Sequence, residues 1–248
     1  MTWLALLLVG CGVVDLANRQ RAPRWLPPVL GAGVALVLGL LAGQTGLRLL
    51  ALLVVAALVV LWSRTVARAF DGGRAWPPLL VLGGGVLLAL ATSGLVAPAA
   101  GPLDGWWHGL TWPLAQGVPV ERALLVLGVL LLQLSTGNVV VRLALAATGT
   151  VDPARTTTQA AADPGDPSHE LKGGRLLGPM ERLLIVGLGL AGNLTAASIV
   201  VAAKGLLRFP ELSSRKEQEQ VHRLTEYFLV GSFVSWMIAL GSLAILAG

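Results

Sequence analysis

Charged residues are scarce in this chain. Asp, Glu, Lys and Arg make up 12% of its 248 residues, whereas 55% are hydrophobic. Soluble domains carry about 25% charged residues. Because so few charges cannot cover the surface of a chain folded in water, we expect lipid to cover much of it.

Cysteine and catalytic motifs are also lacking. The single cysteine, Cys11, excludes an intramolecular disulfide and any multi-cysteine metal site. His108 has no Cys or His companion at metal-ligand spacing. The sequence holds no phosphate-binding loop, nucleophile elbow or HExxH motif. We therefore expect no metal and no cofactor, and an enzymatic activity is the less favoured interpretation.

The net charge of +5 does not indicate a nucleic-acid-binding protein, because the basic residues form short clusters between apolar runs. Such clusters orient membrane proteins and contact anionic lipid headgroups. We expect lipid headgroups as partners, and no nucleic acid. The excess of Arg over Lys, with abundant Ala, Gly, Leu and Val, is typical of GC-rich bacterial genomes and favours a bacterial cytoplasmic membrane.

Long apolar runs are what the sequence has in abundance. A helix needs about 20 apolar residues to cross a bilayer, and it satisfies its own backbone there. We expect seven spans, at 2–18, 25–43, 47–62, 77–97, 123–147, 178–203 and 227–247. The predicted fold is an all-α polytopic transmembrane bundle of about seven helices. Spans one to five occupy 1–149, a flexible polar linker 150–175, and a C-terminal helical hairpin 176–248.

The first span has a second interpretation. Leu8-Val9-Gly10-Cys11 resembles a lipoprotein cleavage box, which would put lipid on Cys11. No basic residue precedes the apolar run, and that run is too short for a signal peptide. We favour an ordinary span with a buried thiol.

Basic clusters predict the orientation. They follow the first and third spans, at Arg19, Arg21, Arg24, Arg64, Arg68 and Arg74. Since basic loops stay cytoplasmic, we expect the N-terminus outside and Trp25, Trp62 and Trp76 at the inner interface. Simple alternation then places 204–226 outside, although it carries five basic residues. Either a late segment fails to cross, with a turn at Gly137-Asn138 or Gly192-Asn193, or this loop is an exception.

Polar residues within lipid are functional candidates by default. On span five, Ser135, Asn138 and Arg142 fall on one helix face. They form either a midplane binding site or a set of interhelical hydrogen bonds.

Span six carries two stripes at helical spacing. The polar stripe is Arg175, Arg182, Asn193, Lys204 and Arg208. It is either a surface that faces an anion or, as we favour, a set of charges that reach lipid headgroups, with only Asn193 lying deep. Small residues form the second stripe, which favours close helix packing: Gly187, Ala191, Thr195, Ser198, Ala202 and Gly205. Among the acids, we expect Asp15 to pair with Arg19, and Glu181 and Glu226 to neutralise nearby basic residues.

The C-terminal third resembles a family of uncharacterised bacterial multi-pass membrane proteins, over about residues 174–240. The residues that carry the resemblance are Gly174-Arg175, Gly178, Glu181-Arg182, Ala203-Lys204, Arg208-Phe209, Glu211, Glu226-Tyr227, Gly231-Ser232 and Ser235. The resemblance implies membrane location and architecture but no reaction. It also implies that Arg175, Glu181, Arg182, Lys204, Arg208, Glu211 and Glu226 form a functional charge cluster.

Three functions compete. The first is a carrier or channel-like protein for a small anionic solute, with Ser135, Asn138, Arg142 and Asn193, together with Lys204 and Arg208, as ligands. The second is a structural or regulatory subunit that binds a partner membrane protein or a second copy of itself through the small-residue stripe. The third is an interfacial enzyme acting on a lipid-linked or phosphate-bearing substrate with Lys204, Arg208 and Glu211 or Glu226.

Overall fold

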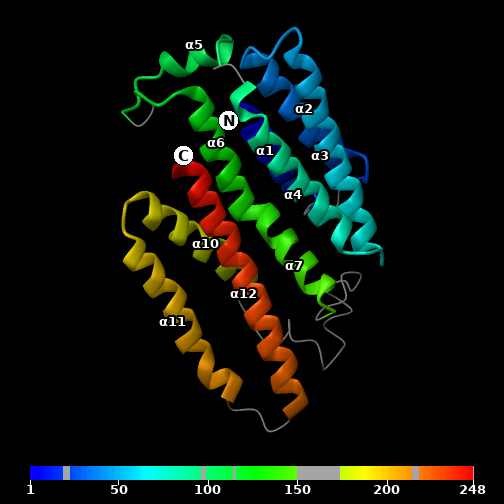
Figure 1. The fold of residues 1–248 in the computed structure, drawn as a ribbon, viewed down its shortest axis with the longest axis vertical. Helices are drawn as coiled ribbons and strands as arrows, with labels where there is room; N and C mark the ends of the chain where they lie inside the picture. The colour runs from blue at the N-terminus through cyan, green and yellow to red at the C-terminus, as the bar shows by residue number, and fades with distance from the viewer. Residues whose placement is uncertain (19–22, 96–98, 114–115, 150–173, 214–217, 248) are drawn as a thin grey trace. The chain divides into compact units, whose positions relative to one another are not determined.

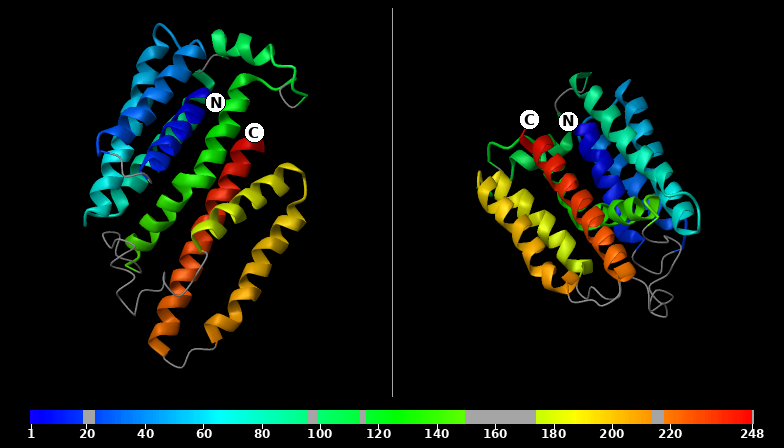
Figure 2. Two further views of the ribbon diagram at one scale, coloured as in Figure 1. Left: turned by 180° about the vertical axis from the view of Figure 1, so that it is seen from behind. Right: turned by 60° about the horizontal axis from the view of Figure 1, so that its bottom comes forward.

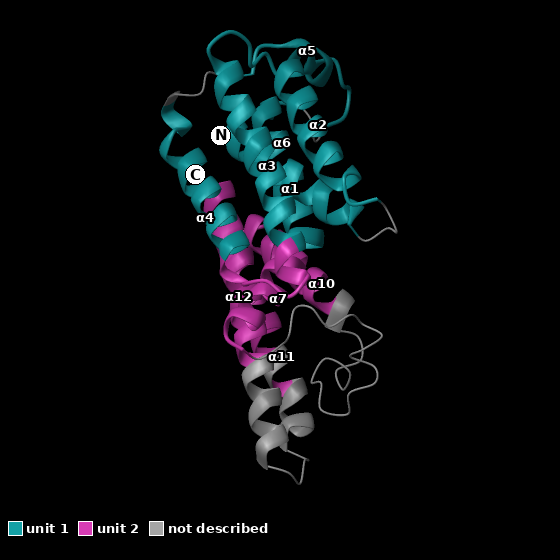
Figure 3. Cartoon of the chain, turned by 90° about the vertical axis from the view of Figure 1, so that its right-hand side faces the viewer, with its two compact units in different colours: residues 1–67, 77–136 teal, residues 68–76, 137–248 magenta. Residues whose placement is uncertain are grey.

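The computed structural model describes residues 1–18, 23–95, 99–113, 116–149, 174–213 and 218–247, with the side chains of 95, 174–176, 204–205, 207–213 and 218–227 excepted. Within these ranges all regular structure is helical (Figure 1), which confirms the all-α part of the predicted fold class. Two compact units divide the chain (Figure 3). Unit 1 is Met1–Ala67 with Pro77–Thr136, and unit 2 is Arg68–Trp76 with Gly137–Gly248.

Helix α1 (Thr2–Ala17) is the most buried element of unit 1, and it packs against α2 (Leu26–Leu41) and α6 (Val120–Leu131). The other elements of this unit are most of α3 (Arg48–Phe70), α4 (Trp76–Ala91), the 3-10 turn Ser93–Leu95 and the short α5 (Pro102–His108). Because α1 is apolar on all sides, it suits the centre of a helical unit. Figure 2 shows α1 between its neighbours from two further directions.

Glycines let three helices of unit 1 approach closely. A Cβ atom added to Gly31 on α2 would lie 2.4 Å from Val14 Cγ2 and 2.6 Å from the Gly10 carbonyl oxygen, both on α1. A Cβ added to Gly10 would lie 2.6 Å from Val59 Cγ2 on α3. Only glycine fits at such contacts between membrane-type helices.

The fifth predicted span is one helical stretch of 28 residues, Val120–Ala147. A π-helical turn, Leu132–Thr136, joins α6 to α7 (Gly137–Ala147). The alternative of a chain reversal at Gly137-Asn138 is wrong, because α7 begins at Gly137 and runs on. The irregularity is instead the π-helical turn just before it.

The sixth predicted span is wrong as a single helix. Helix α10 (Gly174–Leu190) ends at the other suspected break, and α11 (Leu194–Ser213) begins after a three-residue turn. Gly192 has φ +77°, its N–H donates to the Gly189 oxygen at 3.0 Å, and the Asn193 N–H donates to the Leu188 oxygen at 2.8 Å. This is the Schellman arrangement that closes a helix with a left-handed glycine. Helices α10 and α11 pack together as a hairpin beside α12 (Gln218–Ala247) (Figure 1).

Among the residues that the structure describes, three helices are long and apolar enough to cross a membrane, judged by length and composition: Arg48–Phe70, Val120–Ala147 and Phe228–Ala247. Shorter apolar helices are Thr2–Ala17, Leu26–Leu41, Trp76–Ala91 and Leu194–Ala203. The chain is therefore compatible with a membrane location. The count of seven spans is not established.

Candidate functional site

Unit 2 contains a buried arginine that joins three helices. Arg182 on α10 is 1% exposed. Its Nη2 donates to Asn138 Oδ1 on α7 at 2.7 Å, and its Nη1 donates to Ser235 Oγ on α12 at 3.1 Å. Charged hydrogen bonds of this kind are the strong ones. We call Asn138, Arg182 and Ser235 the arginine network.

A carboxylate lies next to the network in the sequence. Glu181 is 5% exposed, and its Oε1 accepts a hydrogen bond from the indole Nε1 of Trp236 at 2.7 Å. Residues 181 and 182 on α10 thus contact residues 236 and 235 on α12, so the two helices are fixed to each other by adjacent polar contacts. The network sits where α7, α10 and α12 meet.

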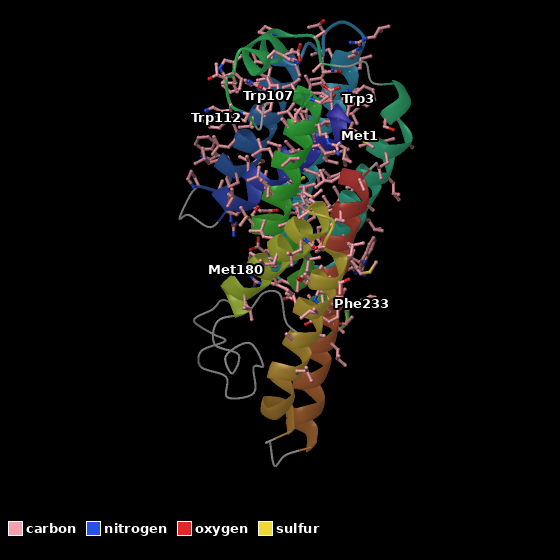
Figure 4. The ribbon with its side chains drawn as sticks, turned by 90° about the vertical axis from the view of Figure 1, so that its left-hand side faces the viewer. Met1, Trp3, Trp107, Trp112, Met180 and Phe233 are labelled. Carbon is pink, nitrogen blue, oxygen red and sulfur yellow. The ribbon has the colours of Figure 1, made fainter. Side chains whose placement is uncertain are left out.

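Gly178 leaves room beside the arginine network. It is one helical turn before Arg182, and a Cβ atom added there would lie 3.6 Å from Arg182 Nη1 and 3.8 Å from Asn138 Oδ1. Gly178 is itself partly exposed. It is therefore a position on α10 at which an added side chain would lie against the Arg182–Asn138 pair. Farther along, Met180 projects outward from α10 and is 60% exposed (Figure 4).

The structure brings together only part of the set predicted on spans five and six. Asn138 and Arg182, predicted separately, are bonded to each other. Ser135 is buried in unit 1, where its Oγ donates to the Gly12 oxygen at 3.1 Å and the Leu131 oxygen at 2.8 Å. Its hydroxyl therefore bonds to helix backbone. The extra residue of the π-helical turn breaks the regular 100° spacing on which the shared face with Asn138 was based.

Arg142 and Asn193 lie elsewhere in unit 2. The Arg142 guanidinium stacks over the Phe70 ring, 4.7 Å from its centroid, and the side chain is exposed. Stacking of this kind is a cation–π contact. Asn193 is exposed in the turn between α10 and α11. The expectation that Asn193 lies deep in a span is wrong, because the helix ends before it.

The prediction that the charge of Arg182 reaches lipid headgroups is also wrong, since the side chain is buried among three helices. The side chains of Arg175, Lys204, Arg208, Glu211 and Glu226 fall outside the described part of the structure. Their place in a charge cluster stays a prediction.

Sequence reasoning missed the indole partners of two buried acids, Asp15 and Glu181. Asp15 on α1 is 3% exposed, and both its oxygens lie 3.2 Å from the indole Nε1 of Trp62 on α3. Trp62 is 0% exposed, so its assignment to an interfacial belt is wrong. Arg19, the expected partner of Asp15, lies outside the described residues. One feature of the sequence could have indicated the Asp15–Trp62 contact. Trp62 lies within an apolar run, and a buried indole N–H requires an acceptor.

Comparison of the chain with protein-family models, curated proteins and solved structures gave no match.

Proposed function

We propose that this chain is an integral protein of a bacterial cytoplasmic membrane and acts as a carrier or channel-like protein for a small anionic solute. The observation that carries the proposal is the buried Arg182 guanidinium at the junction of α7, α10 and α12. The apolar helices support the membrane location.

The chemistry of the arginine network favours an anion. A guanidinium presents planar donors that match carboxylate and phosphate oxygens. The neighbouring Asn amide and Ser hydroxyl have further donors for the same oxygens. Ionisable residues within membrane helices are costly and typically mark solute pathways. The proposed ligand set is therefore Arg182, Asn138 and Ser235. It keeps Asn138 from the expected ligands and leaves out Ser135, Arg142 and Asn193.

Transporter sites commonly lie where several helices meet near the middle of the bilayer. Arg182 and Ser235 fit this pattern, because Ser235 lies eight residues into the apolar stretch Phe228–Ala247. Because an added Cβ at Gly178 would lie 3.6 Å from the guanidinium, the solute would approach it on this side of α10. A larger side chain at this position would cover the Arg182–Asn138 pair without removing either residue.

Osmotic swelling of proteoliposomes tests the proposal across several anions in one assay. The purified protein would be reconstituted and challenged with phosphate, acetate, lactate, chloride and, as an uncharged solute, sucrose. We expect faster reswelling with at least one anion than in protein-free liposomes, and no difference with sucrose. Gly178→Leu and Arg182→Gln should each reduce that rate at least tenfold.

Matched variants keep the test specific. Gly187→Leu places the same side chain on α10 at a position where an added Cβ meets nothing within 4 Å, and Arg142→Gln removes an exposed arginine. Both should transport as the wild type does. Size-exclusion profiles establish that each variant is folded. Equal transport by folded Gly178→Leu and wild type, or no anion flux above protein-free liposomes, would overturn the proposal.

A second function is favoured by one observation. Thr195, Ser198 and Ala202 are exposed along one face of α11, and small residues are typical of helix–helix interfaces in membranes. A structural or regulatory subunit would use this face to bind a partner protein or a second copy of the chain. Replacing Ser198 with Leu should then abolish association in detergent while leaving anion flux, if any, unchanged.

A further inference from the structure

The basic residues of the C-terminal third conflict with seven simple crossings. Residues 204–226 contain Lys204, Arg208, Arg215, Lys216 and Arg223, and strict alternation places them outside. Lys and Arg in short loops are strongly biased to the cytoplasmic face, whereas nearby Asp and Glu have little influence. If the chain crosses the membrane once between residues 173 and 218, the basic residues lie outside. If it returns to the side on which it started, they lie in the cytoplasm and the conflict is removed.

The structure supplies a chain reversal at the required place. Only Ala191, Gly192 and Asn193 separate α10 from α11. The reversal is built into the backbone: Gly192 adopts φ +77°, and the last carbonyls of α10 are capped by the N–H groups of the turn. The two helices then pack against each other.

Contacts with α12 fix the direction of α10. Glu181 and Arg182 bond to Trp236 and Ser235, and farther along α10 a Cβ at Gly189 would strike Leu243. Contacting residues on the two helices increase in number in the same direction, so α10 and α12 run parallel within unit 2. Helix α11 runs opposite to both (Figures 1 and 2).

We infer that α10 and α11 enter and leave the bilayer at the same face, so that segments 150–173 and 204–226 both lie in the cytoplasm and α12 ends outside. This inference rests on the proposed membrane location but not on the solute. It holds whether the tip at 191–193 stops within the bilayer or reaches the far surface, because a hairpin returns its chain to the starting side in both cases. The conflict with the basic residues then disappears.

Cysteine accessibility tests the inference in the full-length chain. In a Cys11→Ser background, single cysteines would be introduced as Ala160→Cys, Ser214→Cys and Ala247→Cys. A membrane-impermeant maleimide is applied to intact bacterial cells and to permeabilised cells. We expect Ala160→Cys and Ser214→Cys to react only after permeabilisation, and Ala247→Cys to react in intact cells. Arg74→Cys and Gln116→Cys, at exposed positions after α3 and before α6, calibrate the inner and outer faces.

Each result has one meaning. Reaction of only one of Ala160→Cys and Ser214→Cys in intact cells would overturn the hairpin. Reaction of both would overturn its cytoplasmic orientation. Recovery of the protein in the soluble fraction after cell breakage would overturn the membrane location itself, independently of the labelling pattern.

Discussion

At the scale of single residues, neutral side chains form hydrogen bonds with the buried charges. The Asp15 oxygens are 3.2 Å from the Trp62 indole nitrogen, the Glu181 carboxylate accepts from Trp236, and Arg182 donates to an amide and a hydroxyl. Neutral hydrogen bonds recover part of the cost of burying a charge. Each of these contacts therefore joins two helices and also holds a charged group inside the protein.

Replacing Trp62 with Phe should destabilise unit 1. The substitution keeps an aromatic ring but removes the donor to a buried carboxylate, and loss of such a bond costs about 1–3 kcal/mol. The thermal midpoint of the detergent-solubilised protein should fall. Trp25→Phe is the matched control, because Trp25 is 64% exposed, and its midpoint should stay at the wild-type value. Equal midpoints for Trp62→Phe and wild type would contradict a stabilising Trp62–Asp15 bond.

At the scale of helices, unit 1 depends on close backbone approach. Gly31 and Gly10 let α2 and α1 come so near that a methyl group has no space between them. Substituting one side chain at this crossing therefore forces the helices apart, whereas the same change elsewhere on α2 does not.

Gly31→Ala and Gly33→Ala form a matched pair on α2. An added Cβ at Gly31 would lie 2.4 Å from Val14 Cγ2, whereas one at Gly33 meets nothing within 4 Å. Overpacking costs about 1–3 kcal/mol, so Gly31→Ala should lower the thermal midpoint. Gly33→Ala should leave it unchanged or raise it, because Ala favours helix over Gly by about 1 kcal/mol. The reverse order of the two midpoints would contradict the α1–α2 crossing.

The helices themselves were predictable, but most of their contacts were not. Apolar runs mark where helices form, and Gly192-Asn193 carries the sequence signal of a helix end, so the break between α10 and α11 was expected as an alternative. Periodicity states which residues share a face of one helix, but not which helix that face meets. Arg182 was therefore expected at lipid headgroups, and its bond to Asn138, 44 positions away, was missed. No sequence signal comparable to Gly192-Asn193 marks the π-helical turn at Leu132–Thr136. This turn is the reason that Ser135 and Asn138 do not share a helix face.

At the scale of the whole molecule, unit 2 is assembled from both sides of the segment 150–173. Helix α7 precedes that segment and α10 and α12 follow it, yet the three helices pack together through the arginine network. The covalent connection between α7 and α10 is therefore not what holds unit 2 together.

Two fragments, residues 1–160 and 161–248, should accordingly copurify when they are co-expressed with an affinity tag on the second. Asn138→Leu in the first fragment removes an acceptor from Arg182, and loss of about 1.5 kcal/mol would weaken association roughly tenfold. Arg142→Gln in the same fragment is the control, since Arg142 stacks on Phe70 within that fragment. Failure of the wild-type fragments to copurify, or equal recovery with Asn138→Leu, would contradict this account of unit 2.

The pairing of indole and carboxylate also makes the chain its own spectroscopic probe. Of its eight tryptophans, Trp62 and Trp236 each bond to a buried acid through the ring N–H. The near-ultraviolet absorption and fluorescence of an indole respond to the strength of that bond. A change of charge or position at Asp15 should therefore alter the contribution of Trp62 to the summed spectrum, and one at Glu181 the contribution of Trp236, without an attached dye.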